Sequence, residues 1–369
     1  MTNLDVGVDP LGMTLADYSV FRGRHRQALR EEYRAMMRRG DGVALPAISR
    51  RTDDSLDGTV KFCLPVEGTG SGPALETESV IIPMTAFGGT KWYTLCLSSQ
   101  VGCRMACSFC ETGRMGLLKN LTAGQIVRQR LVARTIRMTG REEEMAEGNV
   151  RKAKYFADGI HNIVFMGMGE PLDNVENVVQ AIRVFTEPAG LDFPHGQITV
   201  STVGRVDGLR KLAEICKAEP VWRNLRIAIS LNAARDKLRD DLMPINKAMP
   251  LAELKRTLVE YPLAPKARFL IEYVLIKGVN DSLADADAVI DFCRDLPCIV
   301  NLIPYNPQRF AAYETPEEPV ILAFLNHLKE RGIFTKRRVT HGRELMGACG
   351  QLGNPEVRRN KRSGLPVVQ

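Results

Sequence analysis

From Tyr93 onward the chain alternates short apolar runs with longer amphipathic stretches. The runs are rich in β-branched residues, which is typical of parallel strands that are buried on both faces. They are 93–99, 162–167, 198–202, 225–231, 269–276 and 299–305. Between them apolar residues recur at helical spacing, as in Val175, Val178, Val179 and Ile182. These repeats predict an α/β fold, a partial (β/α)6 barrel, whose ligands gather at the carboxyl ends of the strands.

The rest of the chain adds smaller pieces to this barrel, which we expect to occupy residues 93–340. Residues 1–57 contain an arginine-rich helical pattern over 14–39 and then a polar stretch. Residues 58–92 contain two strand-like runs, 58–66 and 78–84, which predict a β-hairpin extension. Residues 341–369 form a C-terminal segment with a cysteine, Cys349, and a basic tail.

The composition and the first residues limit the cellular location that we expect for the protein. The longest apolar runs are under ten residues, whereas about 20 are needed to cross a bilayer. The first residues lack the basic and apolar regions of a secretory signal. We therefore expect a cytoplasmic protein with no membrane partner. The net charge of +7 is compatible with an RNA partner, but many soluble enzymes are equally basic.

Three of the nine cysteines, Cys103, Cys107 and Cys110, follow the first barrel strand in a C-x₃-C-x₂-C pattern. Thiolates are the usual ligands of iron–sulfur clusters. Three ligands on a four-iron cluster would leave one iron free to bind a substrate. A catalytic zinc likewise keeps one coordination position free for its substrate. A structural zinc with a distant fourth ligand, or three buried cysteines, are the alternatives that spacing leaves open.

Other polar residues stand where barrel strands end. In MGMGEP (166–171) the glycines let the backbone approach a ligand, and Glu170 can accept from an ammonium group. Ser201 ends the third strand, residues 230–232 end the fourth, and Asn306 follows the sixth. Each position is compatible with ligand contact, but also with an ordinary strand-to-helix turn, a helix cap or an Asn-Pro turn.

Several longer motifs carry a family resemblance. They are SSQVGCRMACSFCETG (98–113), LKNLT (118–122), MGMGEPLDN (166–174), ITVSTVG (198–204), IEYVLIKGVND (271–281), NLIPYNP (301–307) and GACGQL (347–352). In this order they resemble the RlmN/Cfr family of radical S-adenosylmethionine (SAM) enzymes, from about Gly58 to Leu352. Members of that family methylate an adenine of RNA at carbon 2 or carbon 8.

The resemblance implies two cofactors and the residues that hold them. One [4Fe-4S] cluster would be bound by Cys103, Cys107 and Cys110. SAM would be held at its amino group by Gly169 and Glu170. The remaining contacts to SAM would come from Ser201, Ser230, Leu231, Asn232 and Asn306.

The resemblance also assigns three catalytic roles. Cys349 would be methylated and carry the new carbon, Cys96 would release the product by forming a transient disulfide, and Glu78 would accept the ring proton. From the residues alone, Cys96 reads as a buried hydrophobe and Glu78 as an exposed glutamate before a strand. The implied enzyme is a monomeric methyltransferase that acts on rRNA, tRNA or both, with carbon 2 favoured over carbon 8. It would take its electrons from a donor such as flavodoxin.

The chain departs from the family pattern at several positions. Glu111 stands where a small residue is more usual, Asn232 where histidine is common, and His341-Gly342-Arg343 replaces an Arg-Gly-acid run. Two other functions therefore remain open: a radical enzyme with a protein or small-molecule substrate, and an iron–sulfur redox sensor that binds RNA. Basic residues in the first helix, at 336–338 and at 358–362 would contact RNA phosphates or form a solvated face.

Overall fold

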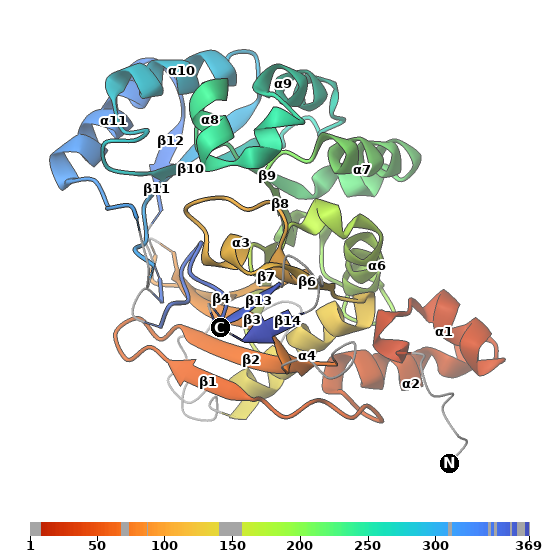
Figure 1. The fold of residues 1–369 in the computed structure, drawn as a ribbon. Helices are drawn as coiled ribbons and strands as arrows, with labels where there is room; N and C mark the ends of the chain where they lie inside the picture. Colours follow the sequence, from red (N-terminus) through yellow and green to blue (C-terminus); the bar gives the residue numbers. More distant parts are fainter. Residues whose placement is uncertain are drawn as a thin grey trace.

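The computed structural model describes most of the chain. The described residues are 9–67, 74–86, 88–139, 157–308, 312–338, 341–342, 345–354, 356–359 and 366–368. Within them, a curved ten-stranded sheet with the order β1-β2-β3-β4-β7-β8-β9-β10-β11-β12 forms the centre of the molecule (Figure 1). Among these residues no helix is both long and apolar enough to cross a membrane.

Seven strands of this sheet, in the order β4-β7-β8-β9-β10-β11-β12, are parallel to one another. They are β4 (Lys91–Cys96), β7 (Ile160–Phe165), β8 (Ile198–Thr202), β9 (Arg226–Ser230), β10 (Phe269–Leu275), β11 (Cys298–Pro304) and β12 (Thr335–Arg337). The predicted α/β fold with its partial barrel is confirmed, and the first six strands fall on the six apolar runs. β12 was not predicted, because it is short and two of its three side chains are exposed.

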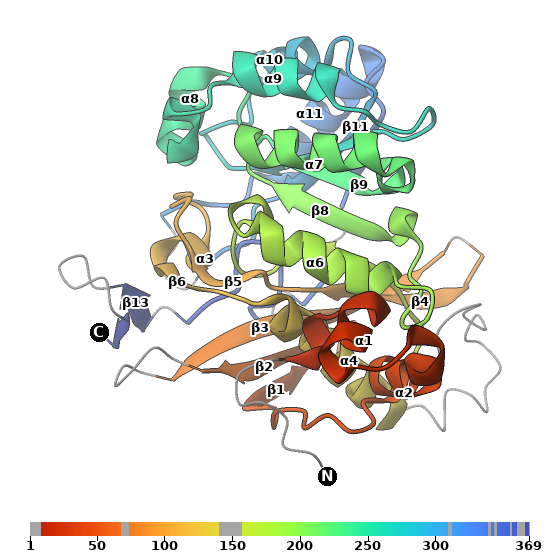
Figure 2. The ribbon, with the colours of Figure 1, turned by 90° about the vertical axis from the view of Figure 1, so that its right-hand side faces the viewer.

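Helices connect these strands and cover the outer face of the sheet (Figures 1 and 2). They are α4 (Ala123–Thr139), α6 (Val175–Thr186), α7 (Val206–Ala218), α8 (Asp236–Leu242), α9 (Leu251–Glu260), α10 (Leu283–Cys293) and α11 (Glu318–Glu330). Most of them bury an apolar stripe; α6, for example, buries Val178, Ala181 and Ile182 against the core.

The arginine-rich region forms two helices where the sequence predicted one. Helix α1 (Leu15–Arg22) ends at Gly23, which adopts a left-handed conformation with φ of 61°, and α2 (Arg26–Arg39) begins after it. Tyr33 ties α2 to the segment before α1 through its hydroxyl, which donates to the carbonyl of Met13 over 2.8 Å, and Arg38 ties it to the barrel by donating to the Gly190 carbonyl over 2.7 Å. Figure 2 shows both helices beside α4.

The antiparallel strands β1 (Arg50–Asp53), β2 (Val60–Val66) and β3 (Leu75–Thr85) extend the sheet from β4. The polar, exposed β1 was not predicted. Glu78 lies inside β3 and is buried, so its placement as an exposed residue before the strand was wrong. The division of the chain at 57, 92 and 340 stays a prediction.

Two small hairpins complete the structure. β5 (Gln100–Cys103) pairs with β6 (Gly116–Asn120), and the short helix α3 (Glu111–Arg114) lies in the loop between them. β13 (Val357–Arg359) pairs with β14 (Pro366–Val368) near the end of the chain. The first hairpin carries the three clustered cysteines.

Candidate active site

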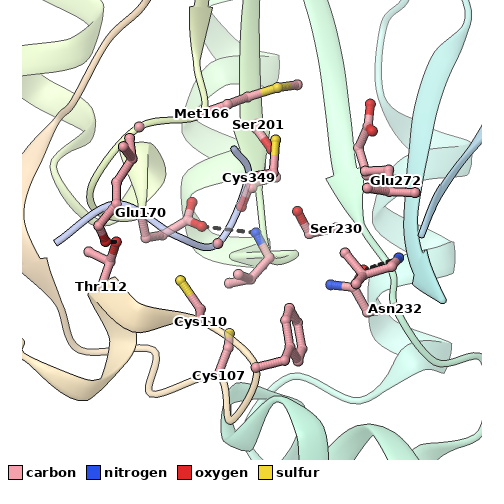
Figure 3. A pocket seen from close by; sticks show the side chains of 18 of the residues that line it. Cys107, Cys110, Thr112, Met166, Glu170, Ser201, Ser230, Asn232, Glu272 and Cys349 are labelled. Atoms are coloured by element: carbon pink, nitrogen blue, oxygen red, sulfur yellow. Dashed lines mark hydrogen bonds between the residues drawn. The ribbon is translucent and has the colours of Figure 1, made fainter. Parts of the chain in front are cut away.

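A cavity of about 150 Å³ opens at the carboxyl ends of the barrel strands. Nine of the residues singled out from the sequence line it: Cys107, Cys110, Gly169, Glu170, Ser201, Ser230, Asn232, Asn306 and Cys349. Their side chains converge from separate strands and loops on one space (Figure 3). Cys96, Cys103, Leu231 and Glu78 lie outside this lining.

The β5–β6 loop places its cysteines at one wall of the cavity. Cys103 ends β5, and Cys107 and Cys110 follow in a tight turn in which the Cys110 amide donates to the Cys107 carbonyl. Burial raises the pKa of all three thiols, and the charges of Cys107 and Cys110 add to the increase at Cys103. The three sulfurs are therefore neighbours in a site with little water.

This donor set fits an iron–sulfur cluster. Among the described residues, no three Cys, His, Asp or Glu side chains converge on a point that would hold a single metal ion. A four-iron cluster does not need that convergence, because each thiolate binds a different iron. Cys103, Cys107 and Cys110 would hold it, and the adjoining cavity would give the fourth iron its open side.

The loop after β7 presents a buried carboxylate to the cavity. Glu170 accepts from the amides of Leu172 (3.0 Å) and Val203 (2.9 Å), so its oxygens are fixed in direction. Burial nevertheless raises its pKa to about 7. The preceding Gly169 has φ of 99°, and a Cβ there would lie 2.5 Å from the Cβ of Gln100. Glycine is required because Gln100 orients the loop by accepting from the Glu170 amide over 2.8 Å.

The ends of β8 and β9 form the next wall. Ser201 and Ser230 are partly exposed to the cavity, whereas the side chain of Leu231 is fully buried and turned away from it. Asn232 adopts φ of 54°, a left-handed conformation that asparagine tolerates, and its side-chain oxygen accepts from the Val274 amide over 2.9 Å. This bond ties the end of β9 to β10 and fixes one edge of the cavity (Figure 3).

A buried arginine that the sequence reading missed holds these strand ends together. The guanidinium of Arg239, in α8, donates to the carbonyls of Leu231 (3.1 Å) and Val203 (2.6 Å) and to the side chain of Asn246 (2.9 Å). Its side chain is 1% exposed. Arg239 is one charge among many in a polar helix, so no local pattern distinguished it.

The C-terminal segment closes the cavity beside the cysteine loop. The Gly350 carbonyl accepts from the Glu111 amide over 2.8 Å, and the Leu352 carbonyl accepts from the hydroxyl of Thr112. Asn306 donates to the Cys349 carbonyl over 3.3 Å. The exposed thiol of Cys349 is thereby directed into the same space as Cys107 and Cys110 (Figure 3).

Cys96 lies behind this cavity, at the end of β4. Burial raises its pKa to about 12, and the charge of Cys349 adds to the increase, so the two thiols are electrostatic neighbours. Arg338 lines the same cavity and interacts with the charges of both thiols. Burial acts to lower its pKa, but the charges of Cys349, Glu272 and Cys96 outweigh burial and raise it. Its guanidinium donates to Glu272 over 3.2 Å.

Glu272 and Arg338 are further cavity residues. Glu272 was not selected from the sequence, and Arg338 was selected only as one of the basic residues 336–338 that would contact RNA phosphates. Glu272 had a signal, since it is a charged residue within the apolar run 269–276. Its side chain is 5% exposed and also accepts from Asn301 over 2.8 Å. No local pattern marked Arg338 as a cavity residue, because it stands in a basic run whose other members are exposed.

Glu78 faces a second cavity, of about 120 Å³. Its carboxylate forms an ion pair with Lys61 (2.8 Å) and accepts from the amide of Gly353 (3.2 Å). Arg50 approaches the other oxygen at 3.5 Å. Glu78 is therefore a buried, ion-paired carboxylate next to the C-terminal segment, and the structure does not bring it into the first cavity.

Comparison with known proteins identifies the family of this chain. Residues 97–292 match the model of the radical SAM superfamily. The chain is 42% identical to "Probable dual-specificity RNA methyltransferase RlmN 1" of Protochlamydia amoebophila, over 80% of this chain and 74% of that protein. It is 39% identical to "Dual-specificity RNA methyltransferase RlmN" of a Chelativorans species, over 91% of this chain and 79% of that protein. The chain belongs to the RlmN family of radical SAM methyltransferases.

A solved structure supports the same assignment for this RlmN-family protein. A radical SAM methyltransferase from Sphaerobacter thermophilus superposes with a TM-score of 0.77 at 33% identity, covering 92% of this chain and 98% of that one. Radical SAM membership implies SAM and an iron–sulfur cluster. The family resemblance read from the sequence is therefore confirmed, and the zinc alternative for the cysteine loop is set aside.

Proposed function

We propose that this RlmN-family enzyme methylates a ring carbon of adenine in rRNA, carbon 2 rather than carbon 8, through a methylated Cys349. The observation that carries the proposal is the place of Cys349. Its exposed thiol lines one cavity together with two cluster cysteines and Glu170, and Cys96 is its electrostatic neighbour. tRNA is a second substrate in this proposal.

The binding roles follow from the cavity lining. Cys103, Cys107 and Cys110 would hold one [4Fe-4S] cluster, and Glu170, with Gly169, would accept from the amino group of SAM. Ser201, Ser230, Leu231, Asn232 and Asn306 would contact the rest of SAM, Leu231 through its backbone. When bound, the cluster would supply the electron that cleaves SAM.

The chain's own residues would then act in sequence. The Cys349 sulfur would carry the new carbon to the adenine ring, and Glu78 would take up the ring proton. The Cys96 thiolate would attack the Cys349 sulfur. The disulfide would form as the bond between that sulfur and the new carbon breaks, and the carbon would take up a proton to become the methyl group of the base. The high pKa of Cys96 means that this thiol stays protonated until the reaction lowers its pKa or removes its proton.

The surroundings of the site are compatible with RNA. Lys336 and Arg337 are exposed on β12, beside the strand ends that form the cavity. They would contact phosphates, while the target base leaves its stack to reach the site. Residues 360–362 of the basic tail lie outside the described residues. An electron donor such as flavodoxin, a monomeric state and a cytoplasmic location belong to the same proposal.

The test is mass mapping of modified adenines in rRNA and tRNA from cells with and without this gene. We expect one 2-methyladenosine that is lost with the gene and restored by the wild-type protein. A strain pair with identical modified adenines would refute the proposal. Cleavage of SAM by the reduced protein without any RNA product would instead identify a radical enzyme with another substrate.

A further inference from the structure

The second cavity contains a carboxylate that the mechanism above does not use. Glu111 is the first residue of α3, directly after the cluster cysteine Cys110, and its side chain is 1% exposed. Among the described residues, neither of its carboxylate oxygens has a hydrogen-bond partner. It lines the second cavity together with Arg50, Lys61, Glu78, Gln351 and Gly353.

The two cavities share their dividing wall. Gly350 and Leu352 line the first cavity, whereas Gln351 and Gly353 line the second. The cysteine loop alternates in the same way, because Cys110 and Thr112 line the first cavity and Glu111 the second. A group bound beside Glu111 would therefore be separated from the SAM site only by the segment that carries Cys349.

The other charged groups of the second cavity already have partners. Lys61 and Arg50 both pair with Glu78, and Lys61 also donates to the Met346 carbonyl over 3.0 Å. Two basic and two acidic side chains make the lining neutral overall. A carboxylate oxygen that is buried without a hydrogen-bond partner is costly. A neutral ligand that brings an N–H donor would supply that partner.

An amino-bearing nucleobase meets this requirement. Carboxylate side chains accept from exocyclic amino groups, and flipped bases are read by hydrogen bonds to their edges. Arg50 is 51% exposed and lies at the edge of the sheet, so the cavity opens to solvent there, while Glu111 and Glu78 lie at its closed end. We propose that Glu111 accepts a hydrogen bond from the exocyclic amino group of the target adenine and so determines base specificity.

This inference rests on the proposed function and adds a residue to it. Glu78 alone would act on a ring carbon of any base held beside it. Glu111 would disfavour a base without an N–H donor on that edge, such as unsubstituted purine, because its buried carboxylate would then stay unpaired. The proposed hydrogen bond also gives a role to Glu111, which departs from the family pattern.

The experiment compares Glu111→Gln with wild-type holoenzyme on rRNA from cells that lack the gene. Glutamine keeps the size of the side chain but replaces one acceptor oxygen with a donor. We expect kcat/KM for RNA methylation to fall by about 10- to 100-fold, the usual range for one lost base contact. Iron content and the transfer of labelled methyl from SAM to Cys349 should stay within about twofold of wild type. Glu76→Gln is the matched control, since Glu76 is on the same strand as Glu78 but outside the cavity lining.

A second arm removes the amino group from the RNA. In this synthetic RNA, purine riboside replaces the mapped adenosine. The kcat/KM of wild type for its methylation should be lower by the same factor than for the adenine RNA, whereas Glu111→Gln should methylate the two RNAs equally well. Equal rates of wild type on both RNAs, or an undiminished rate of Glu111→Gln on adenine, would overturn the inference. Loss of iron or of Cys349 methylation in Glu111→Gln would assign a structural role and also overturn it. If wild type methylates no RNA at all, the proposed function fails instead.

Discussion

Glu170 links the pH of the solution to SAM binding. Burial disfavours its charged form and raises its pKa to about 7, so the carboxyl is protonated below this pH and ionised above it. The ionised fraction therefore rises from about one tenth at pH 6 to about nine tenths at pH 8. Only the ionised form has both oxygens free to accept from the amino group of SAM in addition to the Leu172 and Val203 amides.

The magnitude follows from this titration. A hydrogen bond to a charged group contributes about 1.5–3 kcal/mol, so at pH 8 Glu170→Gln should weaken SAM binding by about 10- to 100-fold. At pH 6 the ratio of the two dissociation constants should be about tenfold smaller, because most wild-type molecules are then protonated. Titration of SAM itself cancels in this ratio.

The assay is equilibrium dialysis of labelled SAM against anaerobically reconstituted wild type and Glu170→Gln, at intervals between pH 6 and pH 8. Iron content serves as the control, since Glu170 is not a cluster ligand in this account. A ratio that does not change with pH would refute the raised pKa. Equal affinity of the two proteins at pH 8 would refute the role of Glu170.

Three further predictions test other parts of the account. Cys103→Ala, Cys107→Ala and Cys110→Ala should each abolish the visible absorbance of the reconstituted cluster, because the loop holds no spare ligand; stoichiometric zinc in wild type would contradict this. Glu78→Gln should leave methylation of Cys349 intact, measured with labelled SAM, and stop RNA methylation, whereas wild-type turnover would exclude Glu78 as the base. Asp158→Ala should lower the free energy of unfolding by about 3–5 kcal/mol, since Asp158 pairs with Arg130 at 2.7 Å and both are nearly fully buried. The matched double variant Arg130→Met/Asp158→Leu should recover most of that loss in the same denaturant titration, and a loss below about 1 kcal/mol in Asp158→Ala would contradict the argument.

The fold was predictable where burial leaves a continuous pattern. The six buried parallel strands are apolar runs, so the sequence marks each of them. The edge strands β1 and β12 were missed because their residues are mostly polar and exposed, and their pairing depends on a neighbour far along the chain. The break between α1 and α2 depends on the left-handed conformation of Gly23, which a single glycine in a helical pattern signals only weakly.

The candidate site was predictable where residues sit in motifs at strand ends. Glu170, Asn232 and Asn306 line the cavity because parallel strands bring their carboxyl ends to one edge. The partners of these residues were not predictable, since they come from distant segments. Arg338 acquires its place by pairing with Glu272, 66 residues earlier, and Glu111 is buried by a segment near residue 350.

The sharpest test of the central claim concerns Cys96 and Cys349. Cys96→Ala leaves the carrier thiol intact but removes the group that would free the product, so the carbon–sulfur link to RNA should persist. The measurement is a denaturing gel of Cys96→Ala purified from cells, with Cys96→Ala/Cys349→Ala as the control. The account predicts a nuclease-sensitive shifted band in the single variant and its absence in the double variant. Normal formation of methylated RNA by Cys96→Ala, with no shifted band, would contradict it.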